Sequence, residues 1–273
     1  MTAPEGGRAR GSPELAHIPI RATVAEAWGL LRSRPRALLL PLIVVQVPVA
    51  LVSSLVVATL LLTTFREQPF QVLGSVSDAT DRGLIFLLVA VAAAQLLFAQ
   101  VARCATIVAV AAEVAGRPAT LTGSLDPAFT RMGAVLAQTI ALIVMGAAFV
   151  ASVVLLPLAP FFLARCGVST EMMILEGQGP IAAIRSSWQL MRGRVIRFVA
   201  TLLLSGLVLL GPLLILSLLN PGIAGGRTAL VWEYAAVSFA QAILAIPITG
   251  FLTAVTTLYY LRAKELTNVR RST

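Results

Sequence analysis

The sequence predicts an all-α, polytopic integral membrane protein with six transmembrane helices and short interfacial helices on its cytoplasmic side, here called elbow helices. Composition is the first observation behind this fold class. Of 273 residues, 58% are hydrophobic and only 12% are charged, and the mean hydropathy is +0.91. A soluble domain of this length cannot hide so much apolar surface. The second observation is a series of apolar runs, each near the 20 or so residues that cross a bilayer. The third is that basic residues gather between alternate runs.

The N-terminal region combines a polar tail with a first elbow helix. Residues 1–17 are rich in Gly, Pro, Ala and charge and lack periodicity, so we expect a disordered cytoplasmic tail. The first elbow is expected at 23–32, where Thr23 and Glu26 have the spacing of a capping box. An apolar stripe with helical spacing follows it: Val24, Trp28 and Leu31. The polar stretch before the first apolar run indicates that this run stays as an anchor rather than being cleaved.

Six apolar stretches are assigned as spans. Their approximate ranges are 37–62, 84–112, 133–155, 157–176, 195–219 and 229–261. The third and fourth are separated at Pro157 and Pro160, because the uncharged run there is too long for one span. The fourth is the least hydrophobic, since it contains Arg165 and Glu171. Residues 18–266 are thus expected to form one membrane domain, followed by a second cytoplasmic tail at 267–273.

The second elbow lies within 176–199 and is the most informative stretch of the chain. Pro180 suits a first helical position, and Gly193 suits a helix stop. The apolar stripe of this helix is Ile181, Ile184, Trp188 and Met191. The polar face is Arg185, Ser186, Gln189 and Arg192. A helix with Trp on one side and Arg on the other, joined to a span, is expected to lie flat at the membrane interface.

The two elbows align with each other, 27–42 on 187–202. The matched pairs are Trp28 with Trp188, Leu30 with Leu190, Arg32 with Arg192, and Arg34 with Arg194. A looser third copy at 122–140 places Phe129 and Arg131 ahead of its span. We interpret three units, each an elbow helix, a span out and a span back, since internal repeats are common in membrane folds. The alternative is that any interfacial helix needs an aromatic residue, an arginine and an apolar stripe.

The basic residues orient the six spans. With the N-terminus inside, most of the 21 Lys and Arg residues lie on the inner side, which is the bias typical of cytoplasmic loops. The outer side holds only Arg66, Arg82 and Arg227. Joining 133–176 into one span would place the arginine-rich second elbow outside. We therefore predict a multi-pass protein of a bacterial plasma membrane with both termini cytoplasmic; the bacterial origin is inferred from the dominance of Arg and the Ala, Leu and Val content of the spans.

Few residues offer chemistry. His17 is the only histidine, so a His-dependent triad or an HExxH metal site cannot form. Cys104 and Cys166 both lie in apolar runs, where a free cysteine acts as a small hydrophobic residue. We expect no catalytic residue, no cofactor and no metal. The net charge of +9 is attributed to topology and anionic lipid rather than to nucleic acid, for which a separate soluble domain is lacking.

Charges inside the predicted spans need a separate explanation. Arg103 and Arg165 lie about 15 Å from the inner ends of their spans, at 1.5 Å per helical residue. Such an arginine costs roughly 3 kcal/mol on insertion scales. Glu171 lies within reach of either side chain. We interpret the three as a charge network that fixes helix packing, and a substrate or ion site is the alternative.

A family resemblance is carried by residues at and near the second elbow: Arg165, Glu176, Gly177, Gly179, Pro180, Ala183, Arg185, Ser186, Trp188, Leu190, Arg192 and Gly193. The segments GRPATL at 116–121 and TTLYYLRAKE at 256–265 add to it. With these residues, 18–265 resembles the membrane domain of glycerophosphoryl diester phosphodiesterases and its stand-alone bacterial relatives. The closing segment departs from the family pattern YxDLRxRxEG, because the Asp is absent and Leu266 replaces the Gly.

The resemblance implies a membrane module without catalysis, since hydrolysis in such enzymes belongs to a separate barrel domain that this chain lacks. We therefore expect a non-enzymatic scaffold or accessory that contacts anionic lipid head groups, or a membrane or cytosolic protein partner. The contact residues are expected on the elbows: Trp28, Arg32, Arg185, Trp188, Arg192 and Arg194. The alternative is a membrane subunit of a transporter, whose coupling helix an inner elbow resembles, although residues 182–193 do not match the loop motif of such permeases. An intramembrane enzyme ranks third.

Overall fold

The computed structural model describes residues 18–64, 79–152, 158–218 and 227–272, and its regular elements are all α-helices. In chain order they are α1 (Ile20–Ser33), α2 (Pro35–Thr64), α3 (Ala79–Val114), α4 (Leu121–Thr130), α5 (Met132–Ala151), α6 (Ala159–Cys166), α7 (Ser169–Glu176), α8 (Pro180–Leu190), α9 (Val195–Leu218) and α10 (Arg227–Ser272). The predicted all-α class is confirmed. The predicted tail at 1–17 lies outside the described residues, as does the stretch 65–78 between the first two predicted spans.

Three helices are long and apolar enough to cross a membrane. Their candidate spans are Pro35–Thr59 in α2, Phe86–Val114 in α3 and Ala235–Val269 in α10. A fourth is possible if α4 and α5 count as one apolar pair, which is bent by 62°. The apolar part of α9 that could be assessed, Val195–Leu209, is shorter. The structure therefore supports a membrane protein with three to four candidate spans.

The predicted span at 157–176 is not one helix. It consists of α6 and α7, each eight residues long, with a break at Gly167 and Val168. The Ser169 hydroxyl donates a 2.7 Å hydrogen bond to the Cys166 carbonyl, which occupies a backbone acceptor that a continuous helix would use. Gly167 also lies against the Phe198 ring of α9, where a Cβ would approach the ring to 2.5 Å. Hydropathy carries no sign of either contact.

The first elbow helix begins three residues before its expected start. α1 starts at Ile20 after Pro19, so Thr23 lies inside the helix and its hydroxyl donates to the Pro19 carbonyl at 3.0 Å. The predicted capping box of Thr23 and Glu26 is therefore wrong. Both residues instead accept hydrogen bonds from Arg262 of α10, and these contacts fasten the first elbow to the last helix.

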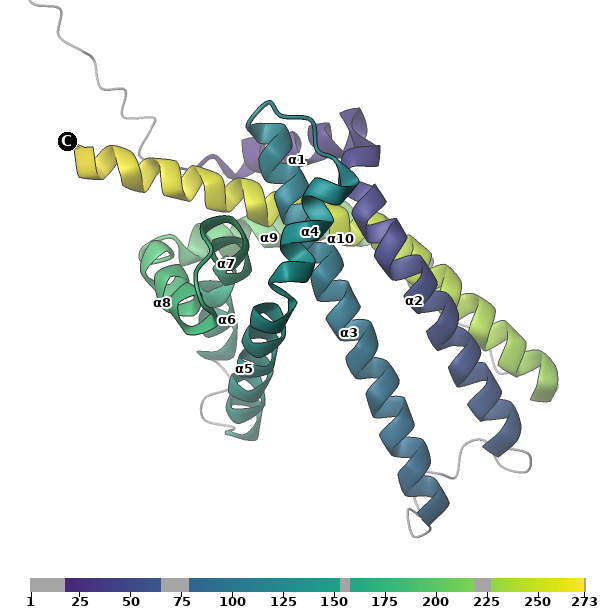
Figure 1. Ribbon diagram of the computed structural model, residues 1–273. Helices are drawn as coiled ribbons and strands as arrows, with labels where there is room; N and C mark the ends of the chain where they lie inside the picture. Colours follow the sequence, from purple (N-terminus) through teal and green to yellow (C-terminus); the bar gives the residue numbers. More distant parts are fainter. Residues whose placement is uncertain (1–17, 65–78, 153–157, 219–226, 273) are drawn as a thin grey trace, which may run out of the picture.

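Three short helices precede three longer ones: α1 before α2, α4 before α5, and α8 before α9. In Figure 1, α10 runs beside α2, while α6, α7 and α8 cluster on the other side of α3. The buried aromatic core lies where the elbows meet the last helix, and it includes Phe198, Tyr259 and Tyr260. Away from it, apolar side chains such as Phe86, Val144 and Leu203 are exposed. Surface of this kind is expected to contact lipid.

Candidate functional site

An arginine stands at the kink between each elbow helix and the longer helix that follows. These kink arginines are Arg34, Arg131 and Arg194. In the first unit, Nη1 of Arg34 lies 2.8 Å from Oε2 of Glu113, near the end of α3. The other carboxylate oxygen of Glu113 accepts a hydrogen bond from the backbone N–H of Ala119 at 3.1 Å. The kink of the first elbow is thus tied to the helix that returns from its own span.

The unit made of α4 and α5, which is the looser copy at 122–140, repeats this arrangement, but its kink arginine donates to backbone carbonyls. Nη1 of Arg131 donates to the carbonyls of Met173 at 2.5 Å and Ile174 at 2.9 Å. These carbonyls lie in the last turn of α7, where helical partners run out. Gly177 then ends the helix with φ +73°, and its Cα lies so close that a Cβ would come within 3.0 Å of the Arg131 guanidinium. Glycine satisfies both the left-handed backbone and the close approach.

The third kink arginine is directed into α10. Nη1 of Arg194 donates to the Ala263 carbonyl at 2.8 Å and to the Thr267 hydroxyl at 3.1 Å. Its own carbonyl accepts from the Tyr259 hydroxyl at 3.0 Å. Arg194 was expected to contact lipid or a partner, but its guanidinium is used inside the protein. Arg34 and Arg194 contact the helix that follows their longer helix, and Arg131 contacts α7, the second helix after α5.

The remaining arginines expected on the elbows are exposed. Arg32 on α1, Arg185 on α8 and Arg192 just after α8 have no ion-pair or hydrogen-bond partner in the part of the chain that the structure describes. Trp28 is half exposed and places its ring 5.8 Å from Phe251 of α10, edge to face. Trp188 is more than a third exposed and lies 5.5 Å from Phe162. We call these exposed aromatic and basic groups of the two elbows together the elbow face.

The orientation of α8 explains how its side chains are divided. Ala183 and Ser187 are fully buried, and the Ser187 hydroxyl donates to the Arg165 carbonyl at 2.7 Å. The predicted apolar stripe does not face the protein as a whole, because Met191 is buried whereas Ile181 is 75% exposed. Small residues thus make the protein contact. Part of the larger apolar surface is left for the surroundings, as expected of an interfacial helix.

The predicted charge network is only partly assembled. Glu171 on α7 is completely buried, and Oε1 lies 3.5 Å from Nη2 of Arg103 on α3. Neither carboxylate oxygen of Glu171 has a hydrogen-bond partner in the described residues. Arg165 does not join them. Its guanidinium lies 4.5 Å from the ring centre of Trp188 and 4.7 Å from that of Phe161, a cation–π arrangement.

The last helix supplies contacts that the sequence did not reveal. Tyr260 donates a hydrogen bond to Oε1 of Glu176, and Nζ of Lys264 lies 2.9 Å from the same oxygen. Together with Arg262, Tyr259 and Ala263, these residues join α10 to all three units. A weak signal was present, because the segment 256–265 concentrates polar residues at the end of an apolar run.

The described side chains form no group of three or more His, Cys, Asp or Glu residues that could hold a metal ion. Cys104 and Cys166 are free and buried. What the elbow face offers chemically is positive charge beside exposed aromatic surface. Comparisons with known protein families, curated proteins and solved structures find no match to this chain.

Proposed function

We propose that this protein is a non-enzymatic integral membrane module, a scaffold or accessory, whose elbow face binds anionic lipid head groups at the cytoplasmic surface. One observation carries the proposal: Arg32, Arg185 and Arg192 are exposed without a described partner, whereas the kink arginines beside them are engaged in the protein. Contacts within the protein therefore explain the kink arginines, but they do not explain the exposed ones. An acidic membrane or cytosolic protein would be recognised by the same charges.

The proposal includes six spans, formed by α2, α3, α5, α6 with α7, α9 and α10. The pairing of each kink arginine with the following span supports three units of two spans. The fourth span is then a broken helix, and its buried polar groups are shielded from lipid by neighbours. This arrangement places the elbows on the arginine-rich side, which is cytoplasmic in a bacterial plasma membrane. It also accords with the proposed kinship to membrane domains of glycerophosphoryl diester phosphodiesterases.

The expected strength follows from the number of exposed charges. A basic residue near an anionic leaflet contributes roughly 1 kcal/mol, and the attraction fades within a Debye length of about 10 Å at 0.1 M salt. Removing Arg185 and Arg192 together should therefore change lipid retention by roughly 30-fold at low salt. The indole of Trp188 adds apolar burial, which salt does not screen.

The test compares lipid retention in nanodiscs that contain a mixture of phosphatidylglycerol and phosphatidylcholine. The double variant Arg185→Gln with Arg192→Gln should retain less phosphatidylglycerol than wild type when the protein is extracted from the nanodiscs. At 1 M salt, the amounts of phosphatidylglycerol retained by the two proteins should become more similar. Arg117 serves as the matched control, because it is exposed in the loop after α3 but lies off the elbow helices. If Arg117→Gln lost as much phosphatidylglycerol per charge removed as the double variant, lipid binding would depend on surface charge in general and not on the elbow face. Unchanged retention in the double variant would refute the proposal.

A transport component is the second candidate, and Glu171 is the observation that favours it. A fully buried carboxylate without a hydrogen bond is costly, and ionisable groups within a membrane commonly mark ion or proton pathways. Proteoliposomes with a pH-sensitive dye inside would then show proton flux that Glu171→Gln abolishes. Copurification of a stoichiometric soluble ATPase would point to a permease. Equal flux in Glu171→Gln and wild type would exclude a proton path through this residue.

A further inference from the structure

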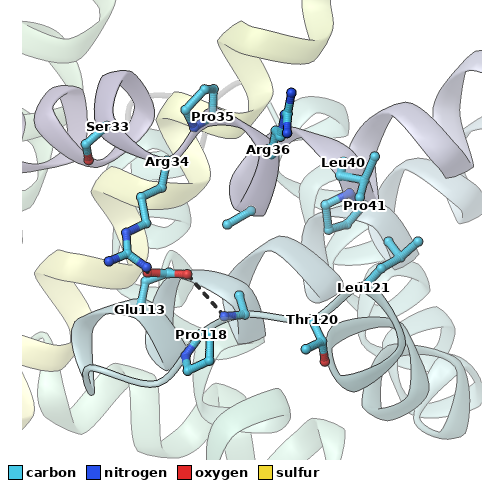
Figure 2. Close-up of a pocket in the computed structure, with 12 residues that line it drawn as sticks. Ser33, Arg34, Pro35, Arg36, Leu40, Pro41, Glu113, Pro118, Thr120 and Leu121 are labelled. Atoms are coloured by element: carbon cyan, nitrogen blue, oxygen red, sulfur yellow. Dashed lines mark hydrogen bonds and ion pairs between the residues drawn. The ribbon is translucent and has the colours of Figure 1, made fainter.

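A cavity of about 550 Å³ lies between the kink of the first elbow, the end of α3 and the start of α4. Figure 2 shows Arg34 and Glu113 along one side, with Leu40, Pro41 and Leu121 on the opposite side. The cavity adjoins the ends of two candidate spans, α2 and α3. It therefore lies at the level where a membrane protein meets lipid head groups.

The charged residues that line the cavity carry a net positive charge. They are Arg34 and Glu113 on one side, and Arg36 near Leu40 (Figure 2). The Glu113 carboxylate is already neutralised by Arg34 and hydrogen-bonded by Ala119, as described above. Arg36 is exposed and has no ion-pair partner among the described residues. The cavity thus retains one uncompensated positive charge, carried by a side chain that the protein does not otherwise use.

Two helices also begin at this cavity. Pro35, the first residue of α2, and Leu121, the first residue of α4, both line it. The N-terminus of a helix carries a partial positive charge of about half a unit. Pro35 has no N–H, and the Thr120 hydroxyl already accepts from the Gly123 N–H, so these ends contribute mainly through that partial charge. Together with Arg36, these ends favour an anion, and guanidinium groups suit phosphate oxygens in particular.

The other side of the cavity is apolar. Leu40 is 41% exposed and follows Arg36 by four residues, which is about 6 Å along the axis of α2. Pro41 and Leu121 extend this surface. Positive charge at the end of a candidate span and apolar surface one turn deeper match the order of groups in a phospholipid, phosphate first and acyl chain below.

We propose that this cavity binds the phosphate of one anionic phospholipid, with Arg36 as the principal charged contact and the acyl chain along Leu40. The proposal rests on the proposed function and narrows it to a single, saturable site. Free phosphate shares the charged chemistry, but it would leave the apolar side uncovered. We therefore assign the lipid as the occupant.

The experiment is a titration of the full-length protein in detergent with dioleoylphosphatidylglycerol, followed by native mass spectrometry. Wild type should bind one lipid more tightly than the rest. Arg36→Gln should weaken that first Kd about tenfold, as expected for one charge-assisted contact, and Arg36→Lys should restore part of it. Arg117→Gln is the matched control, because Arg117 is exposed in the loop after α3 but neither lines the cavity nor belongs to the elbow face, and its first Kd should stay unchanged.

A second variant tests the charge of the cavity with the opposite sign. Glu113→Gln keeps an acceptor for the Ala119 N–H but removes the negative charge, so the first lipid should bind a few-fold more tightly. Two further arms use inorganic phosphate and glycerol 3-phosphate as competitors. Neither should displace the lipid at equal concentration, because neither covers Leu40 and Pro41.

Several outcomes would overturn the proposal. An unchanged first Kd in Arg36→Gln, or an equal loss in Arg117→Gln, would exclude Arg36 as the specific contact. Displacement by inorganic phosphate at equal concentration would make this a free-phosphate site. These results would not bear on the elbow face, because that proposal is tested separately by the salt-sensitive retention of phosphatidylglycerol in the Arg185 and Arg192 double variant. Failure of both tests would refute the proposal that this protein binds anionic lipid.

Discussion

The first and second elbows share a sequence pattern but differ in what their arginines and tryptophans contact. Arg34 and Arg194 occupy aligned positions at the two kinks. Arg34 is more than half exposed and reaches a carboxylate, whereas Arg194 is partly buried and donates to a backbone carbonyl and a hydroxyl of α10. An exposed ion pair contributes about 0–1 kcal/mol and is screened by salt, while a buried charge-assisted hydrogen bond contributes more.

This difference separates an open region at the first elbow from a closed one at the second. At the first elbow, the loose kink leaves room for the cavity beside Arg36. At the second elbow, Arg194 instead contacts α10 through both its guanidinium and its carbonyl. Two copies of one pattern can therefore serve different purposes, because the surrounding helices decide which polar atoms face the arginine. Four substitutions test this contrast, from the largest expected effect to the smallest.

The largest effect is expected at the ion pair between Arg103 of α3 and the buried Glu171 of α7. Arg103→Leu leaves the Glu171 carboxylate buried without its counter-charge, which should lower the free energy of unfolding by about 3 kcal/mol. Thermal unfolding in detergent measures this loss. The double variant Arg103→Leu with Glu171→Leu should recover part of it, because the uncompensated charge is gone. A double variant as unstable as Arg103→Leu alone would show that Glu171 and Arg103 do not stabilise each other.

Arg194→Gln comes next. Loss of the hydrogen bonds to Ala263 and Thr267 should lower the free energy of unfolding by about 2 kcal/mol. The loss should change little with salt, because these acceptors are uncharged. Arg192→Gln, two residues away and exposed, is the control and should change stability by less than about 0.5 kcal/mol. Equal effects of the two variants would place Arg194 in solvent rather than against α10.

Trp188→Ala should cost about 1.5 kcal/mol, slightly more than Trp28→Ala. The reason is that Trp188 contacts both Phe162 and the Arg165 guanidinium, whereas Trp28 contacts Phe251. Trp188→Phe keeps an aromatic face for Arg165 and should recover part of the loss. The same detergent melting assay applies to all three variants. A larger effect at Trp28 would reverse the assignment of the second elbow as the more tightly held one.

The smallest effect is expected for Arg34→Gln, about 0.5 kcal/mol at low salt and less at 1 M salt. The Arg34 side chain is 58% exposed, and Glu113, although only 6% exposed, keeps its hydrogen bond from the Ala119 N–H when the arginine is lost. Melting curves at the two salt concentrations measure the difference. A large, salt-independent loss would mean that the two elbows are held in the same way, and the comparison would fail.

The sequence by itself determined the elements that depend on local chemistry. Apolar runs and the shortage of charge predicted an all-α membrane class, because backbone groups in lipid must be satisfied within helices. Pro180 at a helix start was predicted correctly, since a fixed φ suits the first turn. α8 ends at Leu190, three residues before the predicted stop at Gly193, although Gly193 has the positive φ of +76° that suits glycine in the turn that follows. The alignment of Arg34 with Arg194 also located two of the three kinks.

Only the tertiary structure decided which residues face each other. Hydropathy describes how one segment partitions between water and lipid, and it carries no information about a partner on another helix. For that reason the break between α6 and α7, made by Ser169 and by the approach of Phe198, was not predicted. The same cause separates Arg103, which reaches Glu171, from Arg165, which lies between two aromatic rings, and turns Arg194 inward to α10 while Arg192, two residues earlier, stays exposed.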